Sequence, residues 1–320
     1  MTPRSAIRRW YEASASSSWY EALASSWHEA LAPLFLAAGL ALGTLADAVP
    51  ARNPPVDAGY RILAADFHVH GFPGDGALAP WILRREAARA GLDAIAITNH
   101  NQTATARLGA WLPREDGMPL VLVGQEVTAP DFHLIAVGIR EEVDWRLPPA
   151  AIVEAIHAQG GAAIAAHPSR SYWGYGDAAM TRLDAAEVAL SSRASRVRRA
   201  EVEAFFDRVT QRKPGLAPIG ASDFHFSGPI GNCRTYLFAR EWSVQGIVDA
   251  IRAGRTVAYD DRGRALGDSA RVAVVERLRR QEDASARELQ LWRHVSVALT
   301  LFGLGLLVVR GFSRVTPRRS

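Results

Sequence analysis

Two histidines separated by one residue, His68 and His70, stand at the end of an apolar run that begins at Arg61. Alternate side chains of a strand point to the same side, so a strand over 61–69 would direct both imidazoles and the Asp66 carboxylate to one face. Two neutral imidazoles placed in this way can bind one ion of zinc, iron or manganese. A single pair of this kind is more often a polar strand end than a metal site, so the rest of the chain decides between the two interpretations.

Further histidines and carboxylates follow at, or within a few residues of, the ends of later apolar runs. With the first pair, the set is His68, His70, Asp75, His100, Glu126, His133, His167, Asp223 and His225. A lone histidine is usually a hydrogen-bonded structural residue, whereas six histidines placed alike with carboxylates are typical of a multinuclear metal site. The donors are nitrogen and oxygen without sulfur, which favours Zn, Mn or Fe over a closed structural zinc site.

Strand and helix patterns alternate between residues 61 and 265, which predicts a parallel sheet with crossover helices. We predict strands over 61–69, 92–98, 119–125, 132–138, 161–166, 185–190, 216–221 and 234–239, and helices over 78–90, 103–112, 148–158, 198–212 and 243–253. The fold class is α/β, a distorted TIM-like (β/α)7 barrel with a hairpin-like insertion at 119–138 and flanking hydrophobic terminal helices. In such barrels the chemistry lies at the C-terminal ends of the strands, where the polar set is found.

Composition limits the classes of function. The chain has 320 residues, enough for one large or two small domains, and its formal charge is only +4. Its arginines form no basic stripe interleaved with aromatic residues, so binding to long nucleic acid is not expected. The single cysteine, Cys233, excludes an internal disulfide framework and a cysteine-based zinc site.

Both ends of the chain carry hydrophobic segments. Residues 1–30 form an aromatic leader, which is either an interfacial amphipathic helix or a partly disordered segment. Residues 31–48 are apolar and form a membrane segment or signal anchor, and Ala46-Asp47-Ala48 fits the small-residue pattern before a cleavage site. A Pro-rich linker occupies 49–60, before the 61–265 domain.

After the domain come a charged helical stalk at 266–293, a transmembrane helix at 294–310 and a basic tail at 311–320. The helix is apolar on all sides, which is typical of a membrane span or a deeply buried core helix. Arginines flank both hydrophobic segments on both sides, so the positive-inside rule does not decide the orientation. The cleavage pattern and the tail arginines favour a membrane protein with its catalytic domain outside the cytoplasm.

In order and spacing, five stretches resemble the PHP (polymerase and histidinol phosphatase) superfamily of metal-dependent phosphoesterases. They are 66–70 with 74–76, 91–101, 124–126, 167–168 and 222–225. The later stretches 234–238 and 250–256 resemble the subgroup named after carbaryl hydrolase. The resemblance covers residues 61–260 and does not reach the terminal segments.

The resemblance implies two or three divalent metal ions (Mn, Zn or Fe) in three positions. The first would be held by His68, His70, Glu126 and Asp223, the second by Asp75, His100 and His225, and the third by Glu126, His133 and His167. A hydroxide bridging two ions would attack a small phosphomonoester, diester or nucleotide. The residues expected to be catalytic are His68, His70, Glu126, Asp223 and Asn99.

Two residues leave alternatives open. The family usually has Asp where this chain has Asn99, and an amide cannot ionise, so a proton-transfer role is in doubt while an orienting hydrogen bond is retained. We favour the orienting role. Arg170 either clamps a phosphate oxygen of the substrate or is a solvated loop arginine. The neighbouring Tyr172, Trp173 and Tyr175 either stack on a base or an aromatic leaving group, cap the barrel or touch lipid.

The leading interpretation is therefore a membrane-tethered hydrolase of a small-molecule phosphate ester. One alternative keeps the metal site and changes the substrate to a carboxylic or carbamate ester. Another is a weakened metal-binding module with a scaffolding role at the membrane, which the complete set of ligands disfavours.

Overall fold

The computed structural model describes residues 18–47, 52–189, 191, 196–226 and 228–315. The first part of the predicted leader, Ala48 of the cleavage pattern, the start of the linker (49–51) and the second half of the basic tail lie outside the described residues. The chain divides into two compact units, one over 49–278 and the other combining 1–48 with 279–320. Each unit is described by itself below.

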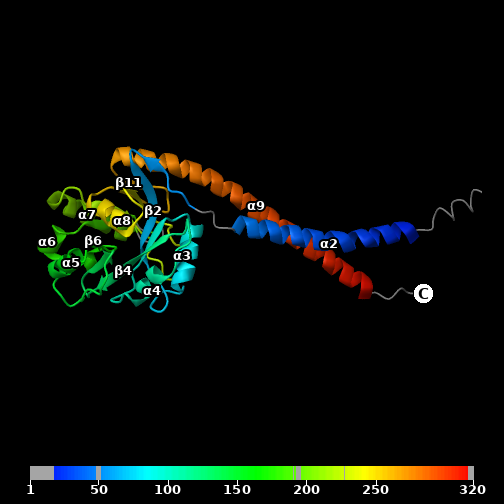
Figure 1. The fold of residues 1–320 in the computed structure, drawn as a ribbon, viewed down its shortest axis with the longest axis horizontal. Coiled ribbons are helices and arrows are strands. Elements are labelled where there is room, and N and C mark those ends of the chain that lie inside the picture. The colour runs from blue at the N-terminus through cyan, green and yellow to red at the C-terminus, as the bar shows by residue number, and fades with distance from the viewer. Residues whose placement is uncertain (1–17, 48–51, 190, 192–195, 227, 316–320) are drawn as a thin grey trace, which may run out of the picture. The chain divides into compact units, whose positions relative to one another are not determined.

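The larger unit is built on a mixed sheet that wraps into a nearly closed barrel (Figure 1). The sheet order is β11-β10-β9-β2-β3-β4-β5-β6-β7-β8, with β1 paired to β2. The strands are β1 Val56–Asp57, β2 Tyr60–Val69, β3 Ala94–Ile97, β4 Leu120–Thr128, β5 His133–Val137, β6 Ala162–Ala165, β7 Ala185–Ala189, β8 Ala217–Gly220, β9 Arg234–Ala239, β10 Thr256–Tyr259 and β11 Ala265–Gly267.

Strand directions agree with the predicted architecture. Strands β2, β3 and β4 are parallel, as are β6, β7 and β8, while β5 is antiparallel to both of its neighbours. The predicted α/β barrel and its hairpin at 119–138 are therefore confirmed. Strand β9 returns antiparallel to β2, and the short strands β1, β10 and β11 were not predicted.

Side-chain hydrogen bonds join the two ends of the sheet. The Thr235 hydroxyl donates to the Gly220 carbonyl at 2.9 Å and accepts from the Gly220 N–H at 3.0 Å. The Thr256 hydroxyl donates to the Pro218 carbonyl at 2.9 Å. A Cβ at Gly220 would lie 2.4 Å from the Arg234 carbonyl oxygen, so the approach of β8 to β9 requires a glycine at this position.

Helices cover the outside of the barrel and all of those predicted are present. They are α3 Pro80–Arg89, α4 Ala104–Trp111, α5 Pro149–Ala158, α7 Arg196–Arg212 and α8 Val244–Arg252, with the shorter α6 Gly176–Met180 and the 3-10 turn η1 Arg170–Tyr172. Proline opens α3 and α5, where a missing N–H costs nothing. Ser243 caps α8 by accepting from the Gly246 N–H at 3.0 Å.

The barrel interior is filled largely by small and branched side chains from many strands. Leu63, Ala65 and Phe67 of β2 belong to this cluster, as do apolar residues of α8 such as Ile247 and Ile251. The apolar packing extends to the N-terminal ends of the parallel strands. Helix α8 lies there against Gly138, which follows the antiparallel strand β5. The C-terminal strand ends carry the polar side chains.

The smaller unit contains the helix α2, Ser18–Asp47, and the later part of α9, Ser269–Val315. The two helices pack through small residues, since the Ser296 hydroxyl donates to the Gly39 carbonyl at 2.7 Å and a Cβ at Gly39 would lie 2.3 Å from the Thr300 hydroxyl. Within the described residues, Leu291–Val308 is long and apolar enough to cross a bilayer, and only 11% of it is buried. The predicted stalk and C-terminal helix are one continuous helix.

Candidate metal centre

Strand β2 supplies the first two histidines, and a break in its pairing sets their direction. The pairing of β2 with β3 changes register between Asp66 and Val69. Phe67 packs in the barrel interior, yet the following residue, His68, also has its ring at the centre of the polar cluster. Register shifts of this kind occur next to active sites, where they re-aim a side chain.

Glu126 lies at the centre of the cluster. It extends from β4 and is fully buried, and each of its two oxygens meets a different group of imidazoles. Oε2 is 3.3 Å from His68 Nε2, 3.4 Å from His70 Nε2 and 2.9 Å from His100 Nδ1. Oε1 is 2.8 Å from His133 Nδ1 and 3.1 Å from His167 Nε2. One carboxylate can therefore bridge two metal positions.

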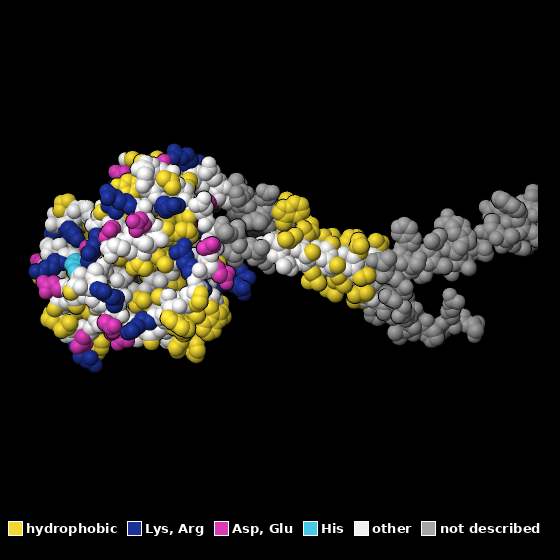
Figure 2. Space-filling model, in the orientation of Figure 1, with side chains coloured by type: hydrophobic (Ala, Val, Ile, Leu, Met, Phe, Trp, Pro, Cys, Tyr) yellow, Lys and Arg dark blue, Asp and Glu magenta, His cyan; other side chains and the backbone are white. Residues whose placement is uncertain are grey.

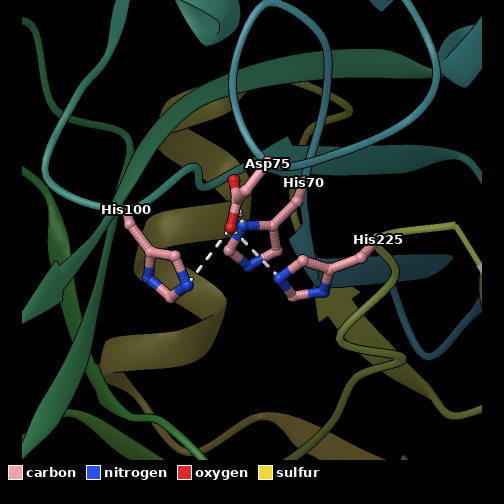
Figure 3. Close-up of side chains that lie close together, drawn as sticks. All are labelled: His70, Asp75, His100 and His225. Carbon is pink, nitrogen blue, oxygen red and sulfur yellow. Dashed lines mark hydrogen bonds and ion pairs between the residues drawn. The ribbon is translucent and has the colours of Figure 1, made fainter.

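A second carboxylate, Asp75, contacts two of the same rings, His70 and His100, and also His225 (Figure 3). It comes from the loop after β2, and its oxygens are 3.0 Å from His70 Nδ1, 3.2 Å from His100 Nε2 and 3.2 Å from His225 Nε2. The His70 and His225 rings stack with their centroids 3.9 Å apart. Of these residues, His70 was predicted for the first metal position only, and the structure brings it to the second group as well.

Two candidate ligands have backbone angles that non-glycine residues rarely adopt. His167, after β6, has φ of 25°, and Asp223, after β8, has φ of 51°. Asp223 Oδ1 lies 3.2 Å from His68 Nε2 and 3.6 Å from His70 Nε2. Backbone strain of this kind persists where surrounding structure enforces it and is concentrated at functional sites.

The mutual attraction of these groups changes their proton affinities. Burial alone would raise the pKa of Glu126, but His68 and the hydrogen-bonded rings of the other histidines keep it well below the usual value. Burial alone would lower the pKa of His68, but Asp223, Glu126 and Glu187 raise it well above the usual value. The pKa of Asp75 is lowered to about 2, against the effect of burial, by its contacts with His70 and His100.

Unsatisfied buried atoms show how the site fits a cation. His68 Nε2, His70 Nε2 and Glu126 Oε2 are buried without a hydrogen-bond partner of good geometry, and they converge on one another. Such atoms are costly to bury unless an ion or a water satisfies them. The nine predicted ligands fall into overlapping groups whose donor atoms lie within 4.8 Å of one another: His70, Asp75, His100 and His225; His68, His167 and Asp223; His68, His70 and Glu126; Glu126, His133 and His167. Nitrogen and oxygen donors in this arrangement fit divalent Zn, Mn or Fe.

One buried carboxylate of the centre was missed from the sequence. Glu187 extends from β7, and its Oε1 accepts from His68 Nδ1 at 2.8 Å while its Oε2 accepts from the His167 N–H at 2.6 Å. An ionised carboxylate can only accept, so Glu187 fixes the proton of His68 on Nδ1 and turns Nε2 to the cluster. The signal for it was a lone charged residue inside the otherwise apolar strand 185–189, because a buried carboxylate needs a partner.

Asp66 has a supporting position beneath the cluster. It is fully buried and accepts backbone N–H groups from His68 at 3.2 Å, Ser222 at 3.1 Å and Gly231 at 2.9 Å. Burial raises the pKa of Asp66 to about 6. This side chain joins the ends of β2 and β8 to the loop before β9, and it is absent from the groups that could bind a metal ion.

Asn99 orients a loop. Its amide oxygen accepts from the Gly71 N–H at 3.0 Å, and its amide nitrogen donates to the Gly71 carbonyl at 2.6 Å. The loop that starts at Gly71 carries Asp75, so Asn99 supports a candidate ligand through the backbone. His100, which we expected Asn99 to orient, instead has its Nδ1 at 2.6 Å from the Thr128 hydroxyl.

The segment 167–175 forms one wall of the cluster. The Tyr172 ring lies against His133 with centroids 4.4 Å apart and ring planes tilted by 41°, while Trp173 donates its indole N–H to the Pro168 carbonyl at 2.7 Å. Tyr175 is buried and its hydroxyl donates to the His133 carbonyl, which is the barrel-capping role. The exposed Arg170 has its guanidinium 5.8 Å from the centroid of the Trp173 ring.

Comparisons with known proteins find one short family match, one curated relative and several solved structures that are similar to this chain. Residues 210–256 match the family model described as PHP-associated. An uncharacterized protein of Methanocaldococcus jannaschii is 30% identical over 118 residues, which span 33% of this chain and 68% of the relative. A two-domain protein from Bacteroides vulgatus that contains a predicted PHP-like metal-dependent phosphoesterase is 24% identical with a TM-score of 0.53, over 67% of this chain and 69% of that one. An amidohydrolase from Chromobacterium violaceum with bound sulfate is 19% identical with a TM-score of 0.39, over 52% and 89%.

Proposed function

We propose that this chain is a member of the PHP superfamily, whose PHP-associated model matches residues 210–256, and that it is a metal-dependent phosphoesterase acting at the mouth of its barrel. The observation that carries the proposal is the convergence of six histidines and three carboxylates, several with buried donor atoms that lack a hydrogen-bond partner. We infer the carbaryl-hydrolase-like subgroup from the stretches 234–238 and 250–256, which resemble it. The substrate proposed is a small phosphomonoester, diester or nucleotide.

The ligand assignment follows the distances. His68, His70, Glu126 and Asp223 would hold one ion; Asp75, His100 and His225, joined by His70, a second; Glu126, His133 and His167 a third. Divalent ions there would stabilise negative charge on phosphate oxygens and lower the pKa of a water nucleophile. Two or three ions of Mn, Zn or Fe are expected.

The remaining residues of the centre act on the ligands and the substrate. Glu187 holds His68 in the tautomer that turns Nε2 to the cluster, and Asn99 fixes the loop that carries Asp75. Tyr172 lines the cluster on the side of His133, where a substrate group can stack. Arg170 on η1 is proposed to bind a phosphate oxygen from the rim, because its side chain is exposed and its guanidinium lies over the face of the Trp173 indole ring.

The test combines metal analysis with a substrate series. The full-length protein, purified in detergent without chelator, is expected to contain two or three equivalents of metal and to hydrolyse at least one of the phosphomonoesters, diesters and 3′,5′-bisphosphates offered. Double replacement of His68 and His70 by Ala should abolish both properties while sparing the fold, because residues at the barrel mouth contribute little to the core. Less than one equivalent of metal would refute the metalloenzyme proposal, and hydrolysis of carboxylic esters alone would refute the phosphoesterase proposal.

We propose further that the enzyme is tethered to a membrane. The helical segment Leu291–Val308 has the length and composition of a span, and the shorter apolar segment Leu31–Ala46 packs on it through Gly39 and Gly43. Close packing through small residues is a common way for helices to associate in lipid. The full-length protein should resist extraction by alkaline carbonate, and release into the soluble fraction would refute the tether. A phosphatase reporter fused at the 49–60 linker should be active if the catalytic domain lies outside the cytoplasm, as we infer.

A further inference from the structure

A second surface lies on helices α3 and α4, and the metal chemistry described above does not use it. Three aromatic side chains there are largely exposed, Trp111 to 78%, Phe72 to 61% and Trp81 to 55%, and Ile82 and Leu108 are exposed beside them. We call these five side chains the α3–α4 face. Figure 2 shows hydrophobic side chains gathered over this part of the domain. A contiguous exposed apolar patch marks a binding surface.

The α3–α4 face is continuous with the loop that carries Asp75. The Thr105 hydroxyl of α4 donates to the Pro73 carbonyl in this loop. A Cβ at Gly109 of α4 would lie 3.2 Å from the Pro80 side chain, at the first turn of α3. The two helices and the loop therefore pack as one body, and whatever binds the face lies at the rim of the metal centre.

Charge beside the aromatic residues indicates the kind of partner. Arg85 follows Trp81 and Ile82 on α3, is exposed and makes no ion pair with a residue that the structure describes, whereas the half-buried Arg84 donates to the Leu112 carbonyl at 3.3 Å. Tryptophan is favoured at the level of lipid headgroups, and each arginine near an anionic leaflet adds to the attraction. Exposed aromatic rings next to the exposed guanidinium group of Arg85 are thus complementary to an anionic membrane surface.

We propose that the α3–α4 face docks on the headgroup region of a bilayer that contains anionic phospholipid, with the mouth of the metal centre at this interface. The inference rests on the membrane tether proposed above, since a span at Leu291–Val308 keeps a bilayer within reach of the domain. Docking gives amphiphilic phosphate esters, which reside at a membrane surface, direct access to the site. The substrate class it favours is therefore a phosphate ester carried on an apolar group.

The experiment uses the full-length chain reconstituted in vesicles of equal parts phosphatidylcholine and phosphatidylglycerol. A polarity-sensitive fluorophore is attached to Ala110→Cys, an exposed position of α4, and its quenching by spin-labelled lipid is measured. The native Cys233 is buried, so the label goes to the introduced thiol. The matched control carries the label at Leu147→Cys, an exposed position before α5. We expect quenching and a blue shift at position 110 and neither at position 147.

A charge variant measures the contribution of Arg85. An arginine near an anionic surface is worth about 1 kcal/mol, or about fivefold, so the Arg85→Gln variant should lower the ratio of docked to undocked protein by about fivefold. In vesicles of phosphatidylcholine alone, the same variant should match the parent. The Trp81→Ala/Trp111→Ala variant should reduce quenching in both kinds of vesicle, because it removes apolar contact rather than charge.

Two results would overturn the proposal. One is a label at position 110 that is as accessible to water as the label at 147 in anionic vesicles. The other is protection that rises with protein concentration and needs no lipid, which would make the face an interface between copies. Quenching requires neither metal nor turnover, so it is independent of the phosphoesterase proposal. If alkaline carbonate extracts the chain from membranes, the proposal of a membrane tether is refuted. Docking can then still be tested by adding the labelled protein to the vesicles and measuring the same quenching.

Discussion

Replacing Glu187 with Gln tests the reasoning about the metal centre most directly. The carboxylate accepts two hydrogen bonds, from His68 Nδ1 at 2.8 Å and from the His167 N–H at 2.6 Å. An amide has only one acceptor oxygen, so one of the two donors must face the new NH2 group. If the oxygen stays on the His167 N–H, the NH2 group donates to His68 Nδ1 and moves the ring proton to Nε2, where it faces the cluster.

The expected loss of metal affinity in the Glu187→Gln variant follows from these contacts. Changing a partner that orients a metal-binding histidine typically costs 10–100-fold in metal affinity. Because Glu187 supports two candidate ligands and no amide orientation satisfies both, we expect the upper end, about 100-fold or ~2.8 kcal/mol. The loss should appear in calorimetric titration of the metal-free protein with Mn²⁺ or Zn²⁺, which reads binding without turnover.

A matched control exists at the other end of the barrel. Asp184, just before β7, accepts from His157 Nε2 at 2.7 Å and from the Ala163 N–H at 2.8 Å, so it also joins a ring to a backbone N–H. The Asp184→Asn variant should lose some stability and bind metal as the parent does. Metal affinity of Glu187→Gln within about threefold of the parent, with the fold intact, would contradict the proposed role of Glu187.

Three further outcomes are expected. Asn99→Asp should destabilise the protein by about 2 kcal/mol in urea unfolding, because a carboxylate oxygen would oppose the Gly71 carbonyl at 2.6 Å; equal stability would contradict the loop-anchoring role. Asp66→Asn should cost about 1–3 kcal/mol, because its NH2 group would meet the Gly231 N–H, and an unchanged denaturation midpoint would refute this. The Asp75 carboxyl has a folded pKa lowered from 3.8 to about 2, so its contribution to the stability of the metal-free protein is present above pH 4 and is lost as the pH falls towards 2. An Asp75→Asn variant should show a weaker decline in melting temperature over this range, and an identical decline would argue against the pairing.

The local pattern of the chain was sufficient to predict the barrel and the ends of its main strands. An apolar run that ends in a histidine or a carboxylate residue predicts both a strand and a candidate metal ligand, because the same few residues form the strand and place the ligand. The short strands β10 and β11 were missed, since Thr256–Tyr259 and Ala265–Gly267 are too brief to show a period. Their place in the sheet depends on β9 and on the contacts that close the barrel.

The supporting side chains could not be predicted in the same way. The role of Asn99 depends on where the backbone of Gly71 lies, which is a property of a folded loop rather than of sequence spacing. Glu187 did leave a trace as the one charge in its strand, but its two partners lie 119 and 20 residues away along the chain. The orientation of the candidate ligands thus depends on the tertiary structure, whereas their presence can be recognised from the local sequence.

The position of Glu126 explains why the ligands form a single centre rather than separate sites. Strand β4 is parallel to β3 and antiparallel to β5, so it lies where the two parallel parts of the sheet meet. One Glu126 oxygen meets rings from the β2–β3 side and the other meets rings from the β5–β6 side. A carboxylate shared in this way would couple metal ions held on its two sides, because charge withdrawn at one oxygen would lower the affinity of the other. The hairpin at 119–138 therefore joins two groups of histidines into one connected cluster of candidate metal ligands.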